Sequence, residues 1–254
     1  MGCNEAARKK FQDLTVKDAF MFAAVMSDEV QCRRFLELVL EMDILEVTVI
    51  TEKTMTYHPE YRGVRLDVLA KEDGRNRRFN IEMQVKKETD LPRRSRYYHS
   101  HMDMDALLTG HRYGELSDTF VIFICDYAIS EPSLYRSTYR TQCQENGELL
   151  QDGRTTIFLS TKGENENEVP KELSDFLKYI GSPEELAQDA ESGSLIASIE
   201  DQVRTIKRSR IWEARFVLME ELLQDERELG RKEGLEEGRE EGLDRMSCLM
   251  RLLK

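Results

Sequence analysis

Two segments that alternate apolar and polar residues most constrain the fold of this 254-residue chain. They are residues 64–70, Val-Arg-Leu-Asp-Val-Leu-Ala, and residues 79–85, Phe-Asn-Ile-Glu-Met-Gln-Val. A period of two is typical of half-buried β-strands, and the Asp-Gly pair between the segments is a turn signal. A hairpin that closes at Gly74 and Arg75 predicts three opposed pairs: Asp67 with Glu82, Arg65 with Gln84, and Glu72 with Arg77.

The two faces of this predicted hairpin differ in chemistry. One face is apolar and is expected to pack on a core, while the other carries Asp67, Glu82, Gln84 and Lys86. Directly opposed side chains have Cβ atoms about 4.5–5.5 Å apart. Two carboxylates that close repel each other unless a cation lies between them or one binds a proton. Oxygen ligands suit a hard cation such as Mg²⁺, which activates water and stabilises charge on a phosphate. The hairpin therefore predicts a metal site at Asp67 and Glu82.

The same residues resemble a known family signature. Arg65-Leu66-Asp67-Val68 followed by Asn80-Ile81-Glu82-Met83-Gln84 is similar to the D…E-x-Q form of the PD-(D/E)XK nuclease motif. More narrowly, the chain resembles the bacterial PD-(D/E)XK nuclease family transposases, or recombination-promoting nucleases. A bare D…E-x-Q matches many hairpins by chance, so the ordered series of further blocks makes the resemblance specific. It is dense over about residues 14–130 and looser over the charged, glycine-containing tail. The further blocks are residues 96–100, 107–110, 113–116 and 121–125.

The resemblance implies a metal-dependent DNA endonuclease that hydrolyses phosphodiester bonds, with a link to transposition or recombination. The implied cofactor is Mg²⁺, with Mn²⁺ as a substitute, and the implied partner is DNA. Asp67 and Glu82 would hold the metal, and Gln84 would position the attacking water. The best-studied nucleases carry lysine where this chain has Gln84, and an amide orients water without supplying a charge. We expect Arg65, or Lys86 on the same face, to replace that lysine.

Further site residues are predicted on the helices that flank the hairpin. The resemblance suggests that an acidic residue of the first helix region, Glu37, reaches the metal, although an exposed helix glutamate is an equal alternative. Arg96 and Tyr97 begin the helix after the hairpin. An arginine near a helix N-terminus has no favourable interaction with the helix dipole, which favours a phosphate or carboxylate partner. The tyrosine is equally explained by packing.

The hairpin turn also carries arginines that are candidate DNA contacts. Arg77 and Arg78 lie within reach of a DNA backbone in this interpretation. Ordinary solvated turn charges are the favoured alternative.

Charge and cysteine content narrow the function classes. The net charge is −12, which is unusual for a DNA enzyme, but the acidity lies away from the hairpin. Residues 60–113 contain 12 Lys or Arg against 9 Asp or Glu, and residues 164–201 contain 2 against 11. A local basic surface can bind nucleic acid on an acidic protein. Five scattered cysteines, no apolar run of membrane-spanning length and no apolar signal region favour a cytoplasmic protein that does not enter membranes.

The order of expected elements predicts the fold class. Helix, three strands, helix and strand is the core order of the restriction-endonuclease-like α/β fold, a mixed sheet flanked by helices. We expect this nuclease-like core at 11–160, a C-terminal helical extension at 170–225, and a charged tail at 226–254. Glycines recur every fourth residue from Gly230 to Gly242, which weakens a helix, so we expect a tail that is mobile or helical. A frayed tail is favoured over close helix–helix contact through the glycines. The expected helices lie near 20–25, 28–42, 90–113, 171–179, 183–191 and 195–223, and the expected strands at 44–51, 64–70, 79–85, 119–125, 137–142 and 155–160.

Two other function classes stay open from the sequence. The first is a catalytically inactive DNA-binding module that keeps the nuclease fold, which Gln84 favours. The second is a protein-interaction module whose acidic helices and tail make a homo-oligomer.

Overall fold

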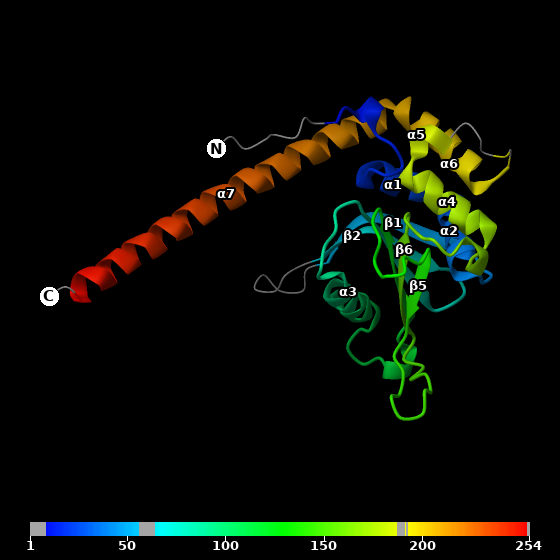
Figure 1. Cartoon of the computed structure of the whole chain (residues 1–254), viewed down its shortest axis with the longest axis horizontal. Coiled ribbons are helices and arrows are strands. Elements are labelled where there is room, and N and C mark those ends of the chain that lie inside the picture. Colours follow the sequence, from blue (N-terminus) through cyan, green and yellow to red (C-terminus); the bar gives the residue numbers. More distant parts are fainter. Residues whose placement is uncertain (1–8, 56–63, 187–190, 192, 253–254) are drawn as a thin grey trace. The chain divides into compact units, whose positions relative to one another are not determined.

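The structure is a computed structural model that describes residues 9–55, 64–186, 191 and 193–252. A six-stranded mixed sheet with the order β1-β2-β3-β4-β6-β5 forms its centre (Figure 1). β1, β2 and β3 pair in antiparallel fashion, β3, β4 and β6 are parallel, and β5 is antiparallel to β6. The sheet flanked by helices confirms the restriction-endonuclease-like fold that the sequence predicted. The strands are β1 Val47–Met55, β2 Val64–Glu72, β3 Arg77–Gln84, β4 Asp118–Cys125, β5 Arg136–Tyr139 and β6 Arg154–Ser160.

The hairpin has the register that its alternation predicted. Val68 pairs with Ile81 and Lys71 with Arg78, and at the turn Arg77 forms an ion pair with Glu72 at 3.4 Å. Beyond Val68 the β2–β3 pairing ends, although β2 stays paired with β1 and β3 with β4. The two strands thus separate where Asp67 and Glu82 lie, and the sheet has a notch there.

Helices cover both faces of the sheet (Figure 1). α3 lies over one face and contacts β4, whereas α1 and α2 contact strands of the β1–β3 half and are joined by α4 and α6. No helix in the described ranges is both long enough and apolar enough to cross a membrane. The α-helices are α1 Ala19–Met26, α2 Glu29–Leu40, α3 Leu91–Ala106, α4 Lys171–Gly181, α5 Pro183–Leu186, α6 Leu195–Lys207 and α7 Arg210–Leu252, and short 3₁₀ turns occupy η1 Phe11–Asp13, η2 Tyr113–Glu115 and η3 Glu166–Glu168.

The polar face of the hairpin is buried along β3, which corrects the expectation of a half-buried strand there, whereas on β2 Arg65 is exposed and Asp67 is half-buried. Asn80, Glu82 and Gln84 are all buried, as are the apolar residues that alternate with them. The reason is that β3 is a central strand with α3 over its polar face. Both faces of β3 are therefore buried, and the alternation separates an apolar buried face from a polar buried face. Val85 and Lys86 were expected to continue the two faces, but they follow the end of β3 and are exposed.

Two helix boundaries differ from those predicted. α3 ends at Ala106 and not near 113, because Leu107 is extended and the chain then turns at Gly110, whose φ is +93°. The helix predicted over 195–223 is divided into α6 and α7. Ser209 stands between them, and its backbone carbonyl accepts a hydrogen bond from Glu213 as α7 begins. No proline or glycine lies at this break, so the sequence gives no local signal for it.

The glycine ladder is helical, which is one of the two states expected for the tail, although fraying was favoured. Gly230, Gly234 and Gly238 lie within α7, and a Cβ added at any of them would meet no atom within 4 Å. The glycines are set among Glu, Arg, Lys and Leu, which are strong helix formers and offset part of the cost of glycine. By its contacts the chain divides into two compact units, residues 1–208 and 209–254. The nuclease-like core at 11–160, the helical extension at 170–225 and the tail at 226–254 remain predictions as domains.

Candidate functional site

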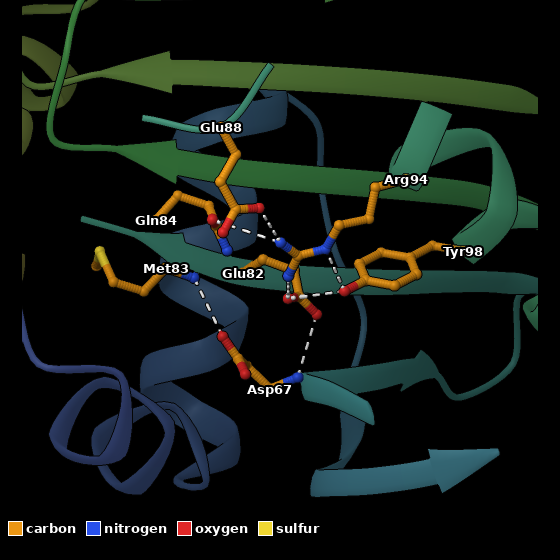
Figure 2. A network of polar contacts seen from close by, with 7 residues as sticks. All are labelled: Asp67, Glu82, Met83, Gln84, Glu88, Arg94 and Tyr98. Carbon is orange, nitrogen blue, oxygen red and sulfur yellow. Dashed lines mark hydrogen bonds and ion pairs between the residues drawn. The ribbon is translucent and has the colours of Figure 1, made fainter. Parts of the chain in front are cut away.

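The notch between β2 and β3 brings Asp67 and Glu82 together on one side of the sheet (Figure 2). The Glu82 Oε1 accepts a hydrogen bond from the Asp67 backbone N–H at 3.2 Å. The Asp67 Oδ2 in turn accepts one from the Met83 backbone N–H at 3.3 Å. Side-chain carboxylates here take the place of the main-chain acceptors that a continued ladder would supply. The two acids therefore lie close together, as the hairpin register predicted. The strands separate here because these side-chain hydrogen bonds replace the backbone ones.

Glu82 is fully buried and is contacted by two residues of α3. Its Oε2 lies 3.2 Å from the Arg94 Nη2 and 3.4 Å from the Tyr98 hydroxyl, which donates to it. Arg94 also donates from Nε to the Tyr98 hydroxyl at 2.7 Å. The guanidinium lies over the rings of Tyr98 and Phe123, at 5.3 and 5.9 Å from their centroids. Arg94 is thus held in place by aromatic neighbours and by hydrogen bonds.

The electrostatics of the notch oppose a second negative charge. Burial and the nearby Asp67 charge together raise the pKa of Glu82 to about 8, although the Asp67 backbone hydrogen bond and the Arg94 charge oppose the increase. A carboxyl with this pKa holds its proton at neutral pH unless a cation compensates its charge. Tyr98 has a raised pKa because of its burial and the Glu82 charge, so it keeps its proton and stays a donor.

A hollow of about 770 Å³ opens beside these residues. Arg94 and Tyr98 form part of its wall, and Arg65, Arg96 and Tyr97 reach it from β2 and α3. Four arginines against Glu88 and Asp90 leave the wall of the hollow with an excess of positive charge, which attracts anions. The residues lining it are Val64, Arg65, Glu88, Asp90, Arg93, Arg94, Arg96, Tyr97, Tyr98 and Ser100.

Of the three residues predicted to act with the acids, one is buried and two are exposed. Gln84 is buried at the end of β3, with its Oε1 3.5 Å from the Arg94 Nη1. Arg65 is exposed and lines the hollow, and Lys86 is exposed beyond β3. The cation in contact with Glu82 and Gln84 is Arg94, where we had expected Arg65 or Lys86.

The two turn arginines lie at the other end of β3. Arg77 pairs with buried Glu72, and Arg78 forms an ion pair with Asp105 of α3 at 2.7 Å. Arg78 is only 14 % exposed. Both guanidiniums therefore have internal carboxylate partners, which differs from the solvated or DNA-facing charges expected from the sequence.

The acids fit a hard divalent cation by their chemistry. They are two oxygen ligands of like charge in a buried notch, and that arrangement favours Mg²⁺ or Mn²⁺. The described residues contain no group of three or more His, Cys, Asp or Glu side chains placed to hold a metal. Glu37, half-buried on α2, therefore does not join Asp67 and Glu82, and the expectation of a third carboxylate from it is not met.

Sequence reasoning missed Arg94 and Tyr98. The signal that could have found them is the buried stripe of α3, formed by Leu91, Tyr98 and Met102. Arg94 lies three residues after Leu91 and four before Tyr98, so it shares that stripe. A charged residue on the buried side of a helix needs a partner, and the hairpin acids are the available ones.

Comparison with known proteins yields a family. The family model for PD-(D/E)XK nuclease family transposases matches residues 19–228. No curated protein and no solved structure matches the chain. The matched range contains both hairpin acids and Arg94.

Proposed function

Because the chain belongs to the PD-(D/E)XK nuclease family transposases, we propose that it is a metal-dependent DNA endonuclease acting at Asp67 and Glu82. The observation that carries the proposal is the notch, which holds two carboxylates side by side with one of them fully buried. A solvated sheet face would leave Glu82 exposed, and its raised pKa marks a site that a cation would complete. Transposition or recombination as the setting, and a cytoplasmic location, are further parts of the proposal.

Each residue of the notch has a role in this proposal. Asp67 and Glu82 would hold Mg²⁺ or Mn²⁺, which when bound supplies an activated water and stabilises charge on the phosphate. Gln84 would orient the water through its amide. Arg94 holds the Glu82 carboxylate in position, and it also faces the hollow. Arg65 and Arg96 would attract the DNA phosphate from the rim of the hollow.

A plasmid-nicking assay tests this function. Supercoiled DNA should be nicked with Mg²⁺ or Mn²⁺ and left intact with EDTA. Asp67→Asn and Glu82→Gln should each lower the rate by at least about 100-fold, because each removes a charged oxygen ligand. Glu115→Gln is the matched control, since Glu115 lies on η2 and is exposed. Equal nicking by all four proteins would assign the activity to a contaminant and end the proposal.

A catalytically inactive DNA-binding module is the second candidate. It is favoured by Gln84 in the lysine position and by the ion pair between Arg94 and Glu82, which places one positive charge at the buried carboxyl without a metal. DNA binding by the wild-type protein without nicking, at any concentration of Mg²⁺ or Mn²⁺, would establish this candidate in place of the first.

A further inference from the structure

Two further hollows adjoin the one beside Glu82. The second hollow, of about 250 Å³, shares Arg96 with the first. The third hollow, of about 510 Å³, shares Ser95, Tyr139 and Thr156 with the second. The three hollows thus lie next to one another around the N-terminal half of α3, and the second and third reach β5 and β6.

The second hollow has the chemistry of an anion site. Its wall contains the guanidiniums of Arg96, Arg140 and Arg154. Arg154 forms an ion pair with Asp152 at 2.8 Å, whereas neither Arg96 nor Arg140 has a carboxylate partner among the residues that the structure describes. Positive charge is therefore in excess.

His99 adds no charge to the second hollow. Its two ring nitrogens lie 2.8 Å from the Thr119 hydroxyl and 3.0 Å from the Thr156 hydroxyl. Burial lowers the pKa of His99 to about 4, so the ring is neutral at physiological pH. The ring fixes Thr156 in the wall, and the arginines provide the charge.

The third hollow is apolar where the second is charged. Most of its wall is apolar, with charged residues only at Lys87 and Glu88. The apolar and aromatic residues are Leu91, Pro92, Tyr127, Ala128, Ile129, Tyr139 and Phe158. Tyr139 is 52 % exposed, and its ring is held edge-to-face on Phe158 with centroids 5.7 Å apart. An exposed aromatic ring held by a neighbour is a stacking platform for a nucleobase. The volume lies in the range of about 300–1,000 Å³ that is typical of small-ligand pockets.

We propose that these two hollows together bind one unpaired nucleotide of DNA, with its phosphate at Arg96 and Arg140 and its base against Tyr139. The inference rests on the proposed function and specifies its substrate class, DNA that contains a single-stranded segment. A base within a duplex has both faces covered by its neighbours, so only an unstacked base can present a face to Tyr139. Arg96 also lines the hollow beside Glu82, so the unpaired nucleotide would lie close to the notch at which we propose that DNA is cut.

Binding measured without metal tests the inference separately from cleavage. Fluorescence anisotropy in EDTA compares a labelled duplex with the same duplex bearing a single-stranded DNA arm. The full-length protein should bind the armed DNA about tenfold more tightly, the scale that stacking of one base on an aromatic ring provides. Tyr139→Ala should remove that preference, and Tyr139→Phe should retain it. Arg140→Ala should weaken binding of the armed DNA more than binding of the duplex, and should make binding of the armed DNA less dependent on salt.

The controls are an exposed tyrosine and an exposed arginine elsewhere. Tyr113→Ala, at a residue that is 85 % exposed on η2, and Arg204→Ala on α6 should leave both affinities unchanged. Equal binding of the two DNAs by the wild-type protein, or an undiminished preference in Tyr139→Ala, overturns the inference. Tighter binding of an RNA arm of the same sequence would assign the hollows to RNA and also overturn it. An inactive protein that prefers the DNA arm would refute the nuclease proposal alone.

Discussion

The Glu82 carboxyl is fully buried beside a second carboxyl, and its charge costs the fold stability. Its pKa is about 8 in the folded chain against an ordinary value of 4.5. The folded state therefore keeps the Glu82 proton, and this contribution to stability is present below about pH 4.5 and lost as the pH rises through 8.

Replacing Glu82 with glutamine should remove that loss. We expect Glu82→Gln to raise the free energy of unfolding by about 0.5–2 kcal/mol at pH 8.5, with the gain disappearing near pH 4.5. Urea unfolding at the two pH values measures it. Glu72→Gln is the matched control on the neighbouring strand. Glu72 is buried but paired with Arg75 and Arg77, so its substitution should destabilise the protein at both pH values. A lower free energy of unfolding for Glu82→Gln than for the wild-type protein at pH 8.5 would contradict the expectation.

The same variant tests the metal. Millimolar Mg²⁺ should raise the midpoint of thermal unfolding of the wild-type protein, because a ligand that binds only the folded state stabilises it. Glu82→Gln should show a much smaller increase, and EDTA should reverse the wild-type effect. An equal response to Mg²⁺ in both proteins would place the cation elsewhere.

Because of His99, we expect the free energy of unfolding to depend on pH in the acid range. The pKa of its buried ring is about 4 in the folded chain against 6.5 ordinarily, so the unfolded chain gains a proton first as the pH falls. Stability is therefore lost between pH 6.5 and 4, by at most about 3 kcal/mol from this residue. His99→Gln should flatten that part of the profile, measured by urea unfolding at several pH values. His111→Gln, at an exposed histidine, should leave the slope unchanged.

Among the elements, α3 positions the site because both of its ends are attached to the sheet. Its first turns contribute Arg94 and Tyr98 to Glu82, and its last turn contributes Asp105. The Asp105 carboxylate bonds the Lys53 Nζ at 2.8 Å and the Arg78 Nη1 at 2.7 Å. These contacts attach one helix to two strands of the sheet and fix the rotation of the helix that brings Arg94 to Glu82.

Removing the Asp105 charge should loosen this attachment. Asp105→Asn leaves Lys53 and Arg78 close together without a carboxylate, and we expect a loss of about 1–3 kcal/mol in the free energy of unfolding. Asp103→Asn on the same helix is the control. Burial raises the pKa of Asp103, so a neutral side chain there should be tolerated or stabilising. If Asp103→Asn lowered the free energy of unfolding as much as Asp105→Asn, the effect would come from the charge of α3 and not from the Asp105 ion pairs.

The glycines of α7 allow a separate prediction for that element. Space is open around Gly230, Gly234 and Gly238, so alanine at each should increase helix stability by about 1 kcal/mol. Circular dichroism at 222 nm during heating measures the change, with Gly110→Ala as a control that should destabilise, because Gly110 has a positive φ. Loss of self-association in the triple alanine variant would instead show that the glycines contact a second copy of the chain.

For the whole molecule, the division at Arg208 predicts an independent nuclease unit. The first unit, residues 1–208, contains every strand and every residue of the notch and the hollows. We expect a chain ending at Arg208 to unfold cooperatively at nearly the same temperature as the full chain and to retain metal-dependent nicking. Sedimentation of the two proteins tests the homo-oligomer that the sequence left open, since an α7-dependent assembly would sediment as a monomer after truncation. Unfolding of the truncated chain at room temperature would contradict the division.

The sequence by itself determined the features that depend on local pattern. Alternation and the Asp73-Gly74 turn set the hairpin register, and the register put Asp67 opposite Glu82. The run of β-branched and aromatic residues at 119–125 marked β4 as a buried strand. These features follow from the period of the strand and the geometry of the turn, which involve only nearby residues.

Only the tertiary structure decided what surrounds the acids. Arg94 contacts Glu82 where Arg65 or Lys86 was expected, Glu37 does not join the two acids, and α3 covers the polar side of β3, which was expected to be half-buried. Each of these depends on how a helix is placed over the sheet, and that placement is set by packing between segments far apart in the chain. A pattern in neighbouring residues shows which face is buried, but the partner of a buried charge is chosen by the fold.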